Sequence, residues 1–102
     1  MSQFETIFHP AELVFQSKDY TSATMLYFKT MFVALDVIIQ KRIGKTPKDH
    51  TERFRILEKE FPLFYSMLHS LFQVYRDTYS KEISKETCEE IRNETITILE
   101  KI

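Results

Sequence analysis

Helix-breaking residues are scarce in this sequence, and that scarcity constrains the fold more than any other feature. Gly44 is the one glycine among 102 residues, and Pro10, Pro47 and Pro62 are the three prolines. A β-sheet fold of this length needs many turns, which draw on glycine and proline. The sequence therefore predicts an all-α fold, in a single domain over residues 1–102 that buries one core unaided.

Apolar residues recur at helical spacing in five segments, and the first covers roughly residues 4–17. Ser2 and Glu5 have the spacing of a capping box at its start. Pro10 lies inside the pattern and lacks the N–H that an interior helical position donates. This helix therefore either kinks at Pro10 or begins there.

The second helix is the longest and runs from an N-cap at Asp19 to Ile43, with Gly44 as its stop. Apolar residues occupy most of its circumference, so it is either the central helix or the carrier of an extra interface. One apolar stripe exceeds what a small bundle covers on one side, which predicts a homodimer through it unless the first or last helix covers it. This stripe consists of Met25, Phe28, Phe32 and Ile39.

Three further helices follow. Asp49 with Glu52 three residues later signals the start of a short third helix, which ends before Pro62. Pro62 opens the fourth helix, to about Thr78, and Ser84 caps the fifth after a polar loop. We expect an antiparallel up-and-down bundle of four main helices plus the short one. The apolar faces of the last two helices are Phe64, Leu68, Leu71, Phe72 and Tyr75, and Cys88, Ile91, Thr95, Ile98 and Ile102.

Charge and cysteine content narrow the classes of function. The 14 basic and 15 acidic residues give a net charge of −1 without a run of one sign. Capture of nucleic acid by charge alone is therefore not expected, although a local basic patch stays open. The beginning of the chain lacks the basic and apolar regions of a secretory signal, and the longest apolar run, interrupted at Asp36, is too short to span a bilayer. We expect a cytoplasmic protein without membrane association.

Few residues suit metal or nucleophilic chemistry. His9, His50 and His69 lie far apart, and none belongs to a recognised metal-ligand motif. Cys88 lies on an apolar face, where a small buried hydrophobe explains it better than a nucleophile does. One glycine cannot make a glycine-rich phosphate loop. We therefore expect neither a metal site nor a cofactor.

The fourth helix carries the most informative polar stripe. On a helical wheel Tyr65, His69 and Arg76 fall on one line beside Gln73, at the border of the apolar face. Arginine and histidine at such a border can hold a phosphate or a carboxylate against a partly dry wall. The alternative is an ordinary helix edge, in which the stem of Arg76 covers the core.

Short motifs over most of the chain are similar to those of the HEPN family (higher eukaryotes and prokaryotes nucleotide-binding). An Asp19-Tyr20 turn precedes a long helix rich in alanine and aromatic residues, and Asp49-His50 precedes the third helix. In residues 71–80 an arginine is followed by a polar and aromatic cluster, as at the end of the family's fourth helix. The resemblance implies the HEPN fold, and HEPN relatives generally dimerise.

The chain departs from the family in the motif that distinguishes its ribonucleases from its other members. Its ribonucleases carry an arginine, a spacer of four to six residues and a histidine, whereas Lys81, Glu82 and Ile83 occupy that window after Arg76. Arg42 and His50 are separated by seven residues and straddle a loop. The chain instead resembles small members that are associated with minimal nucleotidyltransferases and lack the catalytic histidine.

This resemblance implies a non-catalytic module that binds a nucleotide or a partner nucleotidyltransferase, in a toxin–antitoxin-like pair. Arg76 would engage a phosphate or a partner carboxylate, and Asp77 and Tyr79 would orient it or bind the ligand. His50 and His69 are weaker candidates. Two alternatives stay open: an RNA-cleaving enzyme that uses His69 or His50 in an altered site, and a purely structural dimeric bundle.

Overall fold

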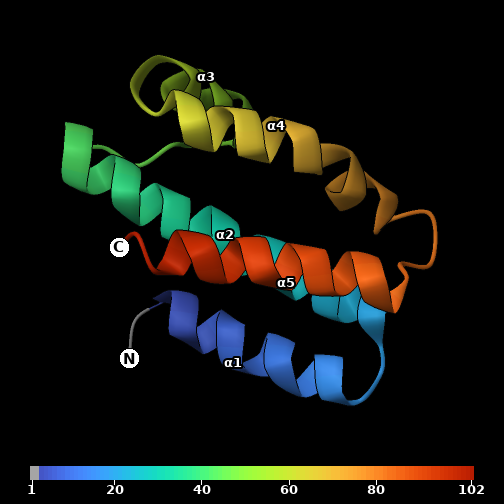
Figure 1. Ribbon diagram of the computed structural model, residues 1–102. Helices are drawn as coiled ribbons and strands as arrows, with labels where there is room; N and C mark the ends of the chain where they lie inside the picture. The colour runs from blue at the N-terminus through green and yellow to red at the C-terminus, as the bar shows by residue number, and fades with distance from the viewer. Residues whose placement is uncertain (1–2) are drawn as a thin grey trace.

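The computed structural model describes residues 3–102, with side chains from Glu5 on. Over this range it consists of five α-helices without a strand: α1 (Gln3–Gln16), α2 (Tyr20–Ile43), α3 (His50–Glu60), α4 (Pro62–Asp77) and α5 (Lys85–Leu99). The all-α prediction is confirmed, and α3, with 11 residues, is the short helix. The four longer helices alternate in direction along the chain (Figure 1).

Side-chain caps set most of the helix boundaries where the sequence predicts them. Asp19, Asp49 and Ser84 each accept a hydrogen bond from the backbone N–H three residues on, at 3.1, 2.8 and 3.2 Å. Gly44 ends α2 in the left-handed conformation, with φ of 74°. Pro62 occupies the first turn of α4, where its missing N–H costs nothing.

The first and last helices qualify the sequence predictions. The expected capping box involves Ser2, which lies outside the described residues. α1 is continuous through Pro10, so the helix does not begin there. The prediction that Ile102 lines the core is wrong, because α5 ends at Leu99 and Ile102 is 37% exposed. The other four predicted positions of α5 are buried: Cys88, Ile91, Thr95 and Ile98.

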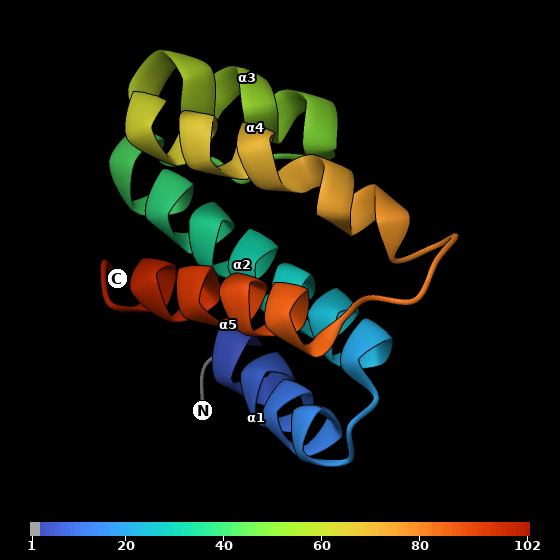
Figure 2. The same ribbon diagram turned by 45° about the vertical axis from the view of Figure 1, so that its right-hand side comes forward.

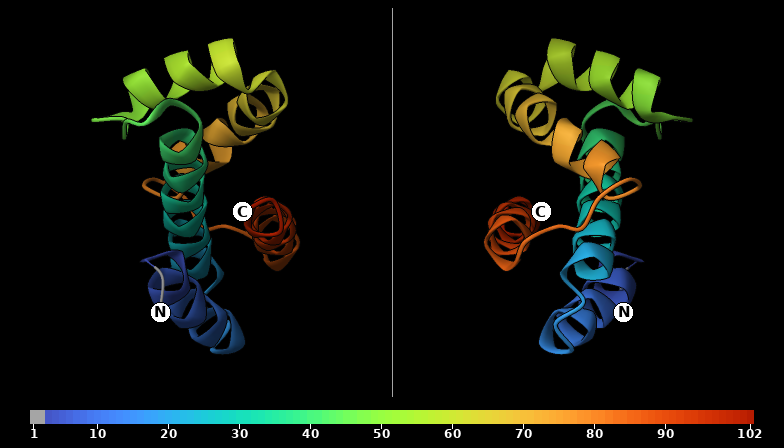
Figure 3. Two further views of the ribbon diagram at one scale, coloured as in Figure 1. Left: turned by 90° about the vertical axis from the view of Figure 1, so that its left-hand side faces the viewer. Right: turned by 90° about the vertical axis from the view of Figure 1, so that its right-hand side faces the viewer.

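The helix α2 lies at the centre of the molecule (Figure 2, Figure 3). α1 and α5 pack against it, and the α3–α4 hairpin crosses another side. α2 is apolar around most of its circumference because it packs against both of these groups of helices. A bidentate ion pair ties the outer helices together, because Arg92 of α5 donates to both oxygens of Glu12 of α1 at 2.6 and 2.8 Å.

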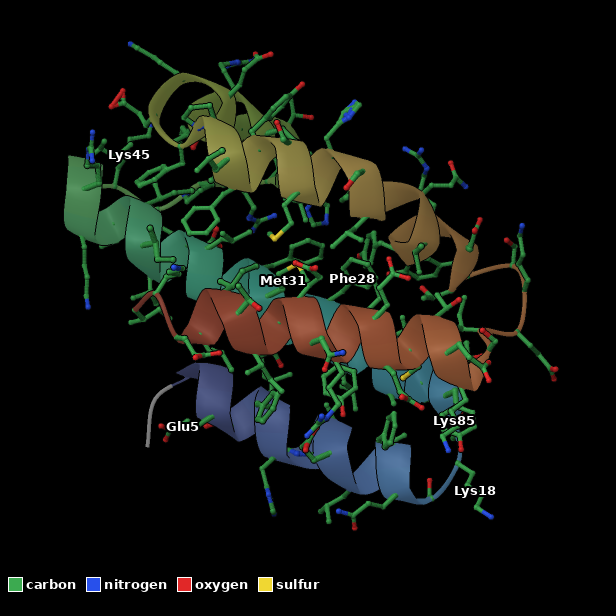
Figure 4. The ribbon with its side chains drawn as sticks, in the orientation of Figure 1. Glu5, Lys18, Phe28, Met31, Lys45 and Lys85 are labelled. Atoms are coloured by element: carbon green, nitrogen blue, oxygen red, sulfur yellow. The ribbon has the colours of Figure 1, made fainter. Side chains whose placement is uncertain are left out.

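The predicted dimer stripe on α2 is not a free surface. Phe28, Phe32 and Ile39 are buried within the chain, and Met25 is only partly exposed. The rings of Phe28 and Phe32 lie 5.3 and 5.1 Å from that of Tyr75 of α4, and Phe28 points into the space between α4 and α5 (Figure 4). The assignment of Phe28, Phe32 and Ile39 to a dimer interface is therefore wrong, while that of Met25 stays a prediction. Part of the covering comes from α4 rather than from the first or last helix alone.

The length and composition of α2 would allow it to cross a membrane. It is the one helix of the described residues with this property, although Asp36 interrupts its longest apolar run. More than half of its apolar stretch is buried inside the molecule. That burial is the normal situation of a core helix in a helical bundle.

Candidate ligand-binding groove

A groove of about 450 Å³ lies between α3 and α4 and is open to solvent. The two helices form a hairpin, so the beginning of α3 faces the end of α4, with the ring of His50 5.5 Å from that of Tyr75. One wall comes from α3 and the other from α4. The lining residues are His50, Thr51, Phe54, Arg55, Glu58, Tyr65, His69, Phe72 and Arg76.

Aromatic rings from both helices line the middle of the groove. The ring of Phe54 meets that of Phe72 edge-on at 4.9 Å and that of Tyr65 at 6.1 Å. The ring of His69 lies 5.6 Å from that of Tyr65. These rings are only partly covered, so they offer π surface on which a flat ligand can stack.

Two arginines give the groove positive charge. Arg55 and Arg76 are exposed, and neither forms an ion pair with any described residue. The guanidinium of Arg76 lies 5.6 Å from the centre of the Phe72 ring. Glu58 is the one carboxylate among the lining residues. Unpaired guanidinium groups in a partly dry groove are suited to phosphate or carboxylate ligands.

Neighbouring side chains on α4 orient Arg76. Its Nη2 donates to Oε1 of Gln73 at 2.8 Å, and Nε2 of Gln73 donates to Oδ1 of Asp77 at 2.8 Å. Lys81 lies 3.8 Å from the same carboxylate. Asp77 therefore acts on Arg76 through Gln73, which leaves the charge of Arg76 unneutralised.

A buried arginine holds His50 at one end of the groove. Nη1 of Arg53 lies 2.6 Å from Nδ1 of His50, and Nε and Nη2 of Arg53 donate to Asp36 of α2 at 2.7 and 2.9 Å. Arg53 is 8% exposed. Burial lowers the pKa of His50, and the positive charge of Arg53 lowers it further. His50 is therefore held in its neutral form.

The structure brings together three of the five predicted site residues. His50, His69 and Arg76 line one groove, and the predicted stripe of Tyr65, His69 and Arg76 is its α4 wall. Asp77 and Tyr79 lie outside the lining residues. Tyr79 is 66% exposed, and its hydroxyl is 3.0 Å from that of Tyr75, whose pKa burial raises to about 12.

Sequence interpretation missed the α3 wall. Thr51, Arg55 and Glu58 follow His50 at spacings that place them on one edge of α3, which a wheel of that helix would have shown. Arg53 was missed as well, although its spacing from Leu57 places it on the buried face. The lone Asp36 within an apolar helix was a signal that a partner cation exists.

Other chemistry finds little support in the described residues. They contain no cluster of three or more His, Cys, Asp or Glu side chains that could hold a metal ion. Cys88 is buried, and burial raises the pKa of its thiol, which disfavours the nucleophilic thiolate.

Comparisons of the chain with family models, with curated proteins and with solved structures find no match. The resemblance to the HEPN family therefore stays a prediction based on short motifs.

Proposed function

We propose that this chain is a non-catalytic, HEPN-type helical module that binds a nucleotide in the α3–α4 groove. One observation supports the proposal above the others: Arg55 and Arg76, without ion pairs among the described residues, share a groove with partly exposed aromatic rings. A phosphate needs cations that no carboxylate neutralises, and a base needs π surface. The groove also falls within the usual size of small-molecule sites, roughly 300–1,000 Å³.

The order of the lining residues suits a ligand with one anionic end. Arg76 and His50 lie where α4 ends and α3 begins, while Glu58 and Tyr65 lie nearer the turn between the helices. An anion at the Glu58 end would meet a negative charge. A base amino group there could donate to the carboxylate. The proposal therefore assigns the phosphate to Arg76 at the His50 end, with Arg55 lining the groove between the two ends, and the base to the Tyr65 end.

The environment of His50 supports binding rather than acid–base chemistry. A general base needs a free ring nitrogen and a pKa near the working pH. Nδ1 of His50 faces Arg53, and the pKa of the ring is lowered.

The competing candidate is an RNA-cleaving enzyme, which the presence of His69 beside Arg76 in the same groove favours. In that enzyme His69 would have to exchange the proton.

Titration calorimetry of the purified chain with AMP, adenosine and inorganic phosphate tests the proposal. We expect AMP to bind more tightly than either of its parts. Arg55→Ala and Arg76→Ala should each weaken AMP binding. Arg42→Ala is the matched control, because Arg42 also has no ion pair with a described residue but lies over Phe61, outside the groove. AMP binding that survives both groove substitutions would overturn the proposal.

The wider biological part of the proposal is supported by the family resemblance, apart from the location, which is the expectation from the sequence without a recognised signal segment. It assigns the chain to the cytoplasm, as a homodimer and as the partner of a minimal nucleotidyltransferase in a toxin–antitoxin-like pair. A neighbouring short nucleotidyltransferase reading frame whose product co-purifies with the chain would support the pairing. Light scattering tests the dimer, and a clean monomer at high micromolar concentration would contradict it. Its interface must use residues other than Phe28, Phe32 and Ile39, which are buried in the chain.

A further inference from the structure

Three side chains from two helices form a hydrogen-bonded chain that ends at the groove. Asp36 of α2 accepts from Nε and Nη2 of Arg53, and Nη1 of Arg53 points to Nδ1 of His50 at 2.6 Å. Arg53 is almost fully buried, while the Asp36 side chain is 20% exposed. The guanidinium also lies 5.0 Å from the centre of the Phe32 ring. Arg53 is therefore fixed on three sides.

The protonation of the pair follows from the chemistry of the donor. A guanidinium has only N–H donors and does not lose its proton in proteins. Nδ1 of His50 must then be the acceptor, with its lone pair toward Nη1 of Arg53. In a neutral imidazole the proton consequently resides on Nε2. The aromatic neighbours Phe32, Phe72 and Tyr75, all within 5.5 Å of the ring centre, restrict rotation of the ring.

We propose that Arg53, held by Asp36, is a positioning residue that fixes His50 as the neutral Nε2–H tautomer and so presents one uncharged donor to the ligand. This inference rests on the proposed function and refines it, because it assigns His50 a hydrogen bond to an acceptor atom of the nucleotide rather than a charge. Arg53 acts through His50 and is not itself among the residues that line the groove.

The device depends on pH in one direction. The ionisable groups around His50 are Asp36 of α2, Asp49 and Arg53 at the start of α3, and Tyr75 and Arg76 of α4. When the ring gains a proton, Nδ1–H points at the guanidinium of Arg53, and the hydrogen bond is replaced by repulsion. The neutral acceptor geometry is therefore stable above the lowered pKa of His50 and is lost below it.

Nitrogen-15 NMR of the full chain without ligand tests the inference. We expect His50 to show a protonated Nε2 and a bare Nδ1 near pH 7.5. In Arg53→Met, the Nδ1–H tautomer should become populated and the titration midpoint of His50 should rise, because the cation is gone and Asp36 has lost its partner. If Arg53→Met does not fold, Arg53→Lys replaces it; because this variant keeps the positive charge but loses the fork, the expected change is in the tautomer and not in the midpoint. An Nδ1–H form already populated in the wild type, a midpoint unmoved in Arg53→Met, or, in Arg53→Lys, a tautomer unchanged from the wild type would overturn the inference.

The matched control is Arg92→Met, which removes the other bidentate arginine clamp, to Glu12, at the opposite side of α2. It should lower stability but leave the His50 signals unchanged. A change in the His50 tautomer in this control would show that loosening the bundle suffices, and that result would also overturn the specific role of Arg53.

Binding of AMP separates this inference from the proposed function. His50→Ala and Arg53→Met should each weaken AMP by about three- to tenfold, the effect of losing one neutral hydrogen bond. The double variant should bind no more weakly than His50→Ala alone, because Arg53 acts through His50. Losses that multiply in the double variant would overturn the positioning role. Absence of AMP binding to the wild type would instead refute the proposed function, whatever tautomer the NMR shows.

Discussion

Arg76→Ala should abolish most ligand binding while hardly affecting the fold, and the structure gives the size of both effects. The guanidinium is exposed, lies over Phe72 and donates to Gln73. An exposed cation–π contact contributes about 0.5–1 kcal/mol, and a side-chain pair at i, i+3 on a helix about 0.2–0.5 kcal/mol. The expected loss of unfolding free energy is therefore about 1 kcal/mol. In a domain of this size that is a fall of about 4–8 °C in melting temperature.

The same substitution removes a charged donor from the phosphate. Hydrogen bonds to charged groups contribute about 1.5–3 kcal/mol, which corresponds to a roughly 10- to 150-fold loss of AMP affinity. Arg76→Lys keeps the charge but loses the planar fork, so a fork-type contact should weaken in it as well. Calorimetric affinity and thermal unfolding are measured on the same three proteins. A large fall in melting temperature with unchanged affinity would refute the functional assignment of Arg76.

Three further predictions concern the surroundings of the groove. Asp36→Ala leaves Arg53 buried without a carboxylate and should lower the unfolding free energy by about 2–3 kcal/mol. This loss is smaller than that of breaking a fully buried pair, because Asp36 is partly exposed. A urea titration that shows no change would contradict this prediction. The pKa of His50 is lowered in the fold, so the unfolded chain binds more protons than the folded chain below about pH 6.5. The free energy of unfolding should therefore fall as the pH is lowered from about 6.5. It should fall less in His50→Gln, which has no imidazole to protonate. The purified domain should not cleave RNA, and metal-independent cleavage abolished by Arg76→Ala would show the opposite.

Local sequence signals predicted the helices well because each boundary has its own chemistry. Asp19, Asp49 and Ser84 cap helices through contacts only three residues long, and Gly44 supplies the left-handed stop. Such contacts do not depend on the rest of the fold. The prediction for Ile102 was wrong because the apolar pattern of α5 continues in the sequence beyond Leu99, where the helix ends.

The dimer stripe failed for a different physical reason. A helical wheel shows that Phe28 and Phe32 are apolar, but it cannot show that α4 returns to cover them. For the same reason, only the α4 wall of the groove was predicted. The α4 stripe with His69 and Arg76 was visible within one helix, whereas its partnership with Arg55 and Glu58 depends on how two helices pack. Packing between helices is information that one sequence without a structure does not supply.

Asp36 links the core to the groove in a way that stability alone does not explain. A carboxylate within a helix as apolar as α2 is costly to desolvate, and an ion pair of this kind is often no more stable than apolar side chains of similar volume. Arg53 nevertheless donates from Nε and Nη2 to Asp36 and from Nη1 to Nδ1 of His50. An apolar pair at the two positions could hold α3 against α2, but it could not donate to Nδ1 of His50. The arrangement is therefore accounted for by the orientation of the histidine rather than by the strength of the ion pair.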